Sequence, residues 1–152
     1  MRISAKVDYA VRALCELAAH QADVPLKAEQ IATGQEIPLS FLENILVDLR
    51  RAGFVRSLRG QVGGYRMAKP PSEITIADVI RAVEGPLADV RGLRPEHLEF
   101  TGSATALREV WLATRVSLRR VLEHVSIADV VTGQIPSEVA VMLEDPDALI
   151  PH

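Results

Sequence analysis

Six basic side chains lie close together between residues 50 and 69, and no acidic residue interrupts them. The segment 49–72 therefore carries a charge of +6 inside a chain whose net charge is −3, which leaves −9 on the rest. Guanidinium and ammonium groups at this density pair with phosphates, so a polyanion such as double-stranded DNA is the expected partner. The alternative is a solvated charged face with no partner. The six residues are Arg50, Arg51, Arg56, Arg59, Arg66 and Lys69.

The decapeptide LRGQVGGYRM (58–67) places three glycines between two of these arginines. Glycine has no Cβ atom and adopts positive φ angles that other residues avoid. We expect Gly60, Gly63 and Gly64 to let a flexible hairpin tip approach a DNA backbone closely. Arg59 at this tip would be attracted by the negative potential of a narrow minor groove. The other five basic residues are expected to pair with phosphates.

Three predicted helices precede the hairpin. Apolar residues at steps of three and four predict helices over 5–19, about 27–33 and 40–52. Ser4 is the expected N-cap of the first helix. Gly34 is the residue expected to follow the end of the second helix.

The third helix has the side chains that could read bases. Ser40 and Glu43 have the spacing of a capping box. Ser40, Glu43 and Asn44 would lie on the exposed face, where asparagine can pair with adenine and glutamate with the cytosine amino group. The expected inward face consists of Phe41, Leu42, Ile45, Leu46 and Leu49.

Strand-forming residues 54–55 and 65–68 flank the glycine-rich tip. Three short helices followed by a two-stranded hairpin describe a winged helix-turn-helix, in which the third helix enters the major groove. The predicted fold is therefore mainly α-helical with a small β-hairpin wing.

The second half of the chain is expected to be helical as well. Thr75 and Asp78 form a capping-box pattern for a compact helix that stops at Gly85. We predict a DNA-binding domain over 1–85, a connector over 86–102, a dimerisation helix and a short following helix over 103–131, and a loose acidic tail over 132–152. The long helix, from 103 to about 125, would span about 33 Å.

Composition excludes several classes of protein. The single cysteine, Cys15, permits no intrachain disulfide, which favours a reducing cytoplasm, and it is expected to be a small buried hydrophobe. No apolar run approaches the ~20 residues of a membrane span. No nucleophile, phosphate loop or metal-ligand spacing points to an enzyme.

Three segments of the chain resemble the Rrf2 family of bacterial transcription regulators: KVDYAVRALCELA, IPLSFLENILVDLRRAGFVRSLRGQVGGYRMAKPPSEITIADVIRAVEG and REVWLATRVSLRRVLEHVSIADVV. The resemblance implies a homodimer, held by the long helix, on a palindromic operator. It also implies base reading by Ser40, Glu43 and Asn44, with Arg59 in the minor groove. Trp111 is expected to be an interface anchor or the wall of an effector pocket. The expected dimer contacts are Leu107, Val110, Trp111, Leu118 and Leu122.

Many members of that family hold an iron–sulfur cluster through three cysteines in the connector, and here that segment contains none. Thr105 and Arg108 stand at two of the ligand positions, so we expect no cluster, no other cofactor and no metal. A DNA-binding repressor that responds to a small-molecule or protein effector is the leading prediction. Two alternatives stay open: a dimeric effector-sensing or protein-interaction module that has lost DNA binding, and an iron–sulfur sensor with Asp8, His97 or Glu99 as ligands.

Overall fold

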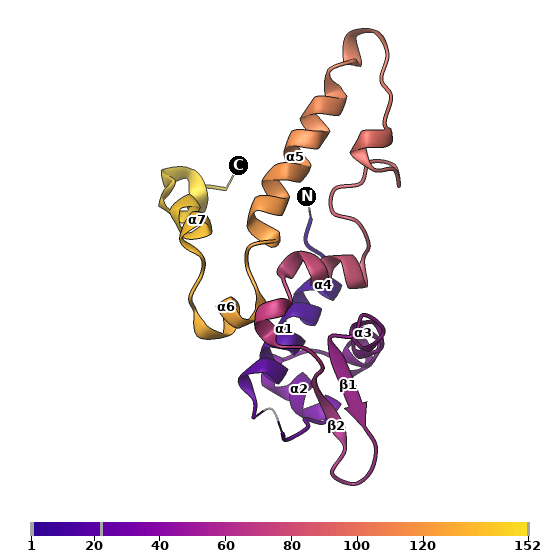
Figure 1. Cartoon of the computed structure of the whole chain (residues 1–152), viewed down its shortest axis with the longest axis vertical. Helices are drawn as coiled ribbons and strands as arrows, with labels where there is room; N and C mark the ends of the chain where they lie inside the picture. Colours follow the sequence, from indigo (N-terminus) through magenta and orange to yellow (C-terminus); the bar gives the residue numbers. More distant parts are fainter. Residues whose placement is uncertain (1, 22, 152) are drawn as a thin grey trace.

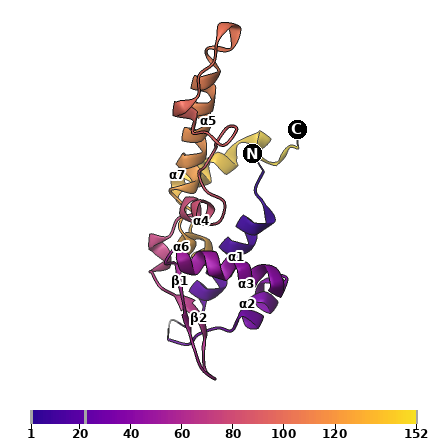
Figure 2. The ribbon, with the colours of Figure 1, turned by 90° about the vertical axis from the view of Figure 1, so that its right-hand side faces the viewer.

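A computed structural model of the chain describes residues 2–21 and 23–151. The molecule is elongated, with a β-hairpin at one end and one long helix that extends towards the other end (Figure 1; Figure 2). This confirms the predicted fold, which is mainly helical with a hairpin wing. The helices and strands are α1 (Ala5–Ala19), α2 (Ala28–Gln35), α3 (Leu39–Arg51), β1 (Val55–Leu58), β2 (Gly64–Met67), α4 (Ile76–Val83), α5 (Leu107–Leu122), α6 (Ile127–Thr132) and α7 (Ser137–Ala140).

The first helix forms as its sequence predicts. The Ser4 hydroxyl oxygen accepts a hydrogen bond from the Val7 backbone N–H at 3.2 Å and so caps a free donor at the start of α1. Val7, Ala10, Leu14 and Leu17 are buried along one side of α1. This stripe makes α1 the central helix, which contacts α2, α3, α4 and α6.

The second helix ends later than expected. It continues through Gly34 to Gln35, and Glu36 caps it in the left-handed conformation with φ 52°. Gly34 instead faces α1, where a Cβ atom would lie 2.8 Å from the Glu16 carboxylate. A side chain at this position would displace the Glu16 carboxylate, and the glycine does not mark the end of the helix.

The third helix differs from the prediction at its start. It begins at Leu39 after Pro38, whose side chain offers no cap, so the predicted capping box of Ser40 and Glu43 is wrong. Phe41 was expected inside and is 62% exposed. A stripe at i, i+3, i+4 and i+7 already fills the buried face without it. That stripe is Leu42, Ile45, Leu46 and Leu49.

The hairpin is a two-stranded antiparallel sheet that is tied to the domain by a third segment. Val55 pairs with Met67 and Leu58 with Gly64. The backbone of Tyr65 exchanges two hydrogen bonds with Leu26, at 2.7 and 2.9 Å. The wing is thus anchored to the segment before α2, and Tyr65 packs partly buried against the core.

The starts of α4 and α6 are joined in one arrangement, which we call the base bridge (residues 74–76 with 125–127). The Ile76 N–H donates to the Val125 carbonyl and the Ile127 N–H to the Ile74 carbonyl, both at 2.9 Å. Each helix also has a capping box, one of which was predicted at Thr75. The base bridge brings the chain back from α5 to the core around α1, where Ile127 is fully buried.

The long helix is shorter than predicted. It runs over Leu107–Leu122, about 24 Å at 1.5 Å per residue. Residues 102–104 form a 3-10 turn instead, and the Thr105 hydroxyl donates to the Gly102 carbonyl at 2.7 Å. At the other end, residue 125 is already extended in the base bridge. No residue of α5 is buried in the single chain.

The C-terminal segment is more ordered than the loose tail expected from sequence. Pro136 precedes α7, and 3-10 turns follow over Val141–Glu144 and Pro146–Leu149. Val139 is buried. Within residues 2–21 and 23–151, every helix is too short or too polar to cross a membrane.

Candidate nucleic-acid interface

The start of α3 presents the three predicted base-reading side chains to solvent. Ser40, Glu43 and Asn44 are all exposed. The Asn44 amide donates to the Ser40 carbonyl at 3.1 Å, which holds that side chain along its own helix. Phe41 adds an exposed aromatic ring between them in sequence, and sequence reasoning missed it.

The end of α3 connects the helix to the wing. Arg50 reaches the Ser57 hydroxyl of β1 at 3.5 Å, the limit of a hydrogen bond. The Arg51 side chain is 76% exposed and has only a 3.7 Å contact with Asp48. Both guanidinium groups are therefore available for another partner at this end of α3.

The two strands of the wing place like charges face to face. Arg56 on β1 lies directly opposite Arg66 on β2. Such a pair destabilises a hairpin, because the side chains of opposite residues are about 5 Å apart at Cβ. The Arg66 Nε atom is buried and has no acceptor among the described residues. Lys69 lies above the Phe54 ring, 5.7 Å from its centroid. This concentration of positive charge is what an external polyanion would relieve.

The glycines of the tip divide into two kinds. Gly60 has φ 106° and open space around it, next to the exposed Arg59. Cβ atoms on Gly63 and Gly64 would instead collide with the carbonyl oxygens of Leu58 and Leu26. Gly63 and Gly64 therefore serve the closure of the hairpin, and Gly60 is the glycine at which a partner has room to approach.

Lys6 positions α3 and was also missed by sequence reasoning. Its ammonium group pairs with Asp48 of α3 at 2.8 Å and donates to the Val83 carbonyl at the end of α4 at 2.9 Å. One side chain of α1 thus connects the recognition helix to α4. No local sequence signal reveals this role, because its partners are distant in sequence.

Comparison with known proteins agrees with this geometry. Residues 3–133 match the Rrf2 family, described as iron-dependent transcriptional regulators. The chain belongs to the Rrf2 family. It is thereby a helix-turn-helix transcriptional regulator, a class of DNA-binding proteins and not of enzymes, as predicted from sequence.

Named Rrf2 relatives cover nearly the whole chain. A Mycobacterium tuberculosis protein described as an HTH-type transcriptional regulator, Rv1287, is 47% identical over 145 residues, which cover 95% of this chain and 90% of that protein. The solved structure of CymR, the global cysteine regulator of Bacillus subtilis, matches with a TM-score of 0.73 and 33% identity over 88% of this chain and 98% of that one. IscR of T. potens matches with a TM-score of 0.71 and 30% identity, over 93% and 96%.

The predicted interface residues of this Rrf2 protein lie on α5 in three environments. Val110 is 52% exposed, and Leu107 is half-buried near the start of the helix. Leu122 packs against the core of the DNA-binding domain. Trp111 and Leu118 line a cavity of about 570 Å³ against α1 and α4. The Trp111 Nε1 atom is buried there without an acceptor in the described part of the chain.

The side chains of this chain do not fit an iron–sulfur cluster of the kind that the Rrf2 resemblance implies. Clusters are held mainly by thiolates, and the one cysteine lies half-buried on α1, far in sequence from the connector. Burial raises the pKa of the Cys15 thiol to about 11. Asp8 is paired with Arg12 at 3.0 Å. Within residues 2–21 and 23–151 of one chain, no three His, Cys, Asp or Glu side chains form a metal-binding group, so Asp8, His97 and Glu99 do not come together.

Proposed function

We propose that this protein is a cluster-free repressor that binds a palindromic operator as a homodimer. One observation carries the proposal: six basic residues, with no acidic residue between them in sequence, lie at the end of the recognition helix and along the wing segment. Like charges held together in this way, including an opposed pair of arginines, are compensated when phosphates bind.

Base reading is assigned to the exposed start of α3. Asn44 can pair with adenine, and Glu43 can accept from the cytosine amino group. Ser40 can pair with several bases. Phe41, 62% exposed beside these residues, can contact a thymine methyl group. These four side chains would set the sequence of each half-site.

The wing is assigned to the neighbouring minor groove. Arg59 stands beside Gly60, whose surroundings are open, so the tip can approach the sugar–phosphate backbone closely. A narrow minor groove concentrates negative potential, which attracts an inserted arginine. Arg50, Arg51 and Arg56 would pair with phosphates on either side and so contribute affinity without sequence preference.

The exposed apolar surface of α5 supports a homodimer. A helix with no buried residue in the single chain nevertheless exposes Val110 at 52% and Val116 at 47%. A second copy of the same helix would cover this surface by two-fold symmetry. The two wings would then read half-sites one or more helical turns apart, about 34–36 Å for one turn. A dimer that covers its operator excludes polymerase from overlapping DNA, and this is the basis of the proposed repression.

The test is to select bound fragments from the source genome and to titrate the best one with salt. A dimer that neutralises about 6–10 phosphates should lose roughly 10³–10⁵ in affinity between 50 and 200 mM salt. Arg59→Ala should weaken operator binding by about tenfold or more. Arg120→Ala, an exposed arginine of α5 away from the wing, is the matched control.

Three results would count against the proposal. If no palindrome is enriched, the chain is better explained as an interaction module. If Arg59→Ala and Arg120→Ala weaken operator binding equally, Arg59 contributes only to the net charge of the protein and makes no specific contact through the wing. Iron and sulfide in an anaerobic preparation would overturn the cluster-free assignment.

A further inference from the structure

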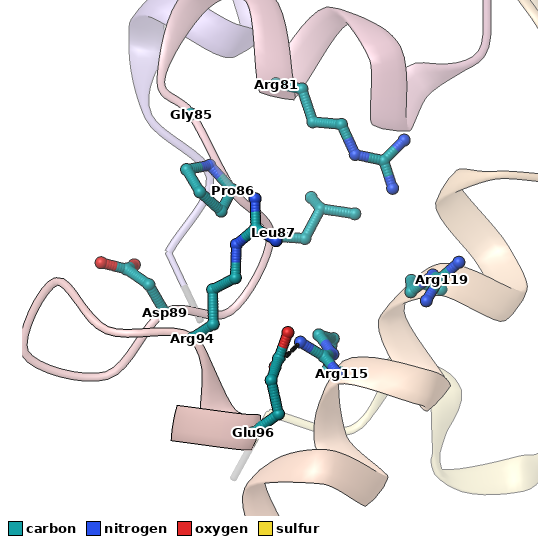
Figure 3. Close-up of a pocket in the computed structure, with 9 residues that line it drawn as sticks. All are labelled: Arg81, Gly85, Pro86, Leu87, Asp89, Arg94, Glu96, Arg115 and Arg119. Carbon is teal, nitrogen blue, oxygen red and sulfur yellow. Dashed lines mark hydrogen bonds and ion pairs between the residues drawn. The ribbon is translucent and has the colours of Figure 1, made fainter. Parts of the chain in front are cut away.

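A second group of arginines lies outside α3 and the hairpin, on α4, the connector and α5. It surrounds a cavity of about 490 Å³ where α4, the connector and α5 meet. Figure 3 shows the guanidinium groups around this cavity, with two carboxylates and an apolar wall formed by Pro86 and Leu87. The charged lining residues are Arg81, Arg94, Arg115, Arg119, Asp89 and Glu96.

Three of the four arginines are paired with carboxylates within the chain. Arg115 pairs with Glu96. Arg81 and Arg119 share the Glu123 carboxylate, which Arg119 contacts at 2.9 Å, and Arg81 also contacts Asp78 at 3.5 Å. Asp89 also lines the cavity, and Arg94 is the arginine without a carboxylate partner among the described residues.

Two donors at this cavity have no acceptor within residues 2–21 and 23–151. The Arg94 guanidinium group makes no hydrogen bond or ion pair with these residues, although Arg94 lines the cavity. The Nε atom of Arg115 is buried without an acceptor. A buried donor without an acceptor costs about 1–3 kcal/mol, so an acceptor from outside the chain would be favoured here.

We propose that this cavity binds a small organic oxyanion, a compound with a carboxylate or phosphate group and an apolar portion. Guanidinium groups match the two oxygens of such groups with parallel N–H donors. Arg81, Arg94 and Arg119 would hold the anionic group. Leu87 would contact the apolar portion. The cavity volume lies in the range of small-molecule sites.

The ligand would compete with Glu123 for its two arginines. Arg81 belongs to α4 in the DNA-binding domain, whereas Glu123 follows the last turn of α5. An oxyanion on Arg81 and Arg119 would therefore release an ion pair that ties the two parts together. Anion binding itself does not depend on the proposed DNA interface, but its effect on operator affinity rests on that function.

The experiment is isothermal titration of the full chain with three probes: inorganic phosphate, glycerol phosphate and succinate. Comparison of the two organic probes distinguishes a phosphate monoester from a dicarboxylate. Arg94→Gln should weaken binding of the preferred probe about tenfold and leave folding intact, because this side chain is exposed and has no partner in the described structure. Arg120→Gln removes the same charge one residue beyond Arg119, outside the lining, and should change nothing.

Glu123→Gln provides the distinguishing readout. It removes the internal competitor and should tighten binding several-fold, which a merely structural role for these residues does not predict. No binding of any probe would overturn the proposal, as would equal losses in Arg94→Gln and Arg120→Gln, or unchanged binding in Glu123→Gln. Operator binding is measured separately without any probe, so its failure would count against the DNA-binding function and not against this site.

Discussion

Replacing Arg56 by glutamine should stabilise the protein and weaken its binding to DNA. Arg56 faces Arg66 across the hairpin, and like charges directly opposite destabilise a strand pair by roughly 0.2–1 kcal/mol. Removal of one charge should raise the free energy of unfolding by that amount. In the proposed dimer it also removes two phosphate contacts. Each contributes about 0.9 to the salt slope, so the slope should fall by about 1.8.

The two effects are measured separately. Urea denaturation at low salt gives the change in stability, which should shrink as salt screens the two charges. Fluorescence anisotropy with the selected operator between 50 and 200 mM salt gives the slope. Arg56→Lys keeps the charge and is the matched control, with both quantities unchanged. The reasoning is refuted if Arg56→Gln lowers stability, or if its salt slope equals that of the parent.

Three further outcomes follow from the structure. Gly64→Ala should lower the free energy of unfolding by roughly 4 kcal/mol, because it combines a strained backbone with the loss of two hydrogen bonds to Leu26. Gly60→Ala should lower it by only about 1–2 kcal/mol. Equal losses of the two variants in urea denaturation would contradict this distinction. Ser126→Ala should cost about 1 kcal/mol at neutral pH. Hydrogen bonds from the Ser126 side chain and backbone lower the pKa of Asp129, its capping-box partner. The stability difference between Ser126→Ala and the parent should therefore shrink in thermal melts as pH falls below about 4, and a constant difference would argue against this cap. Burial raises the pKa of the Cys15 thiol to about 11. Cys15 should therefore react with iodoacetamide at least about 100-fold more slowly in the folded protein than in urea. Equal rates would show that the thiol is accessible.

The features predicted well from sequence depend on neighbouring residues. Ser4 lies three residues before the N–H that it caps, and Thr75 lies three before Asp78, so each signal is complete within one turn. The buried stripe of α1 likewise repeats along one helix. Such patterns need no knowledge of the rest of the molecule.

The errors arose where distant segments decide the outcome. Gly34 follows the usual pattern of a helix end, but α2 continues through it to Gln35, and Gly34 lies beside the Glu16 carboxylate of α1. The end of α5 is set by the pairing of residues 125–127 with 74–76. The arginines around the 490 Å³ cavity come from α4, the connector and α5, so no charged run in the sequence reveals them. Arg81, Arg94 and Arg119 become neighbours only through the fold.

Because of the base bridge, the connector and α5 form a long loop whose two ends meet at the DNA-binding domain. The chain leaves after α4 and returns at Val125, whose carbonyl accepts a hydrogen bond from the N–H of Ile76 at the start of α4. Closing a loop of twice the length costs only about 0.6 kcal/mol more. Evolution, or an engineer, can therefore exchange the intervening segment for one of different length and chemistry while the recognition helix and wing keep their positions. In this arrangement the connector and α5 form an insert that can be replaced.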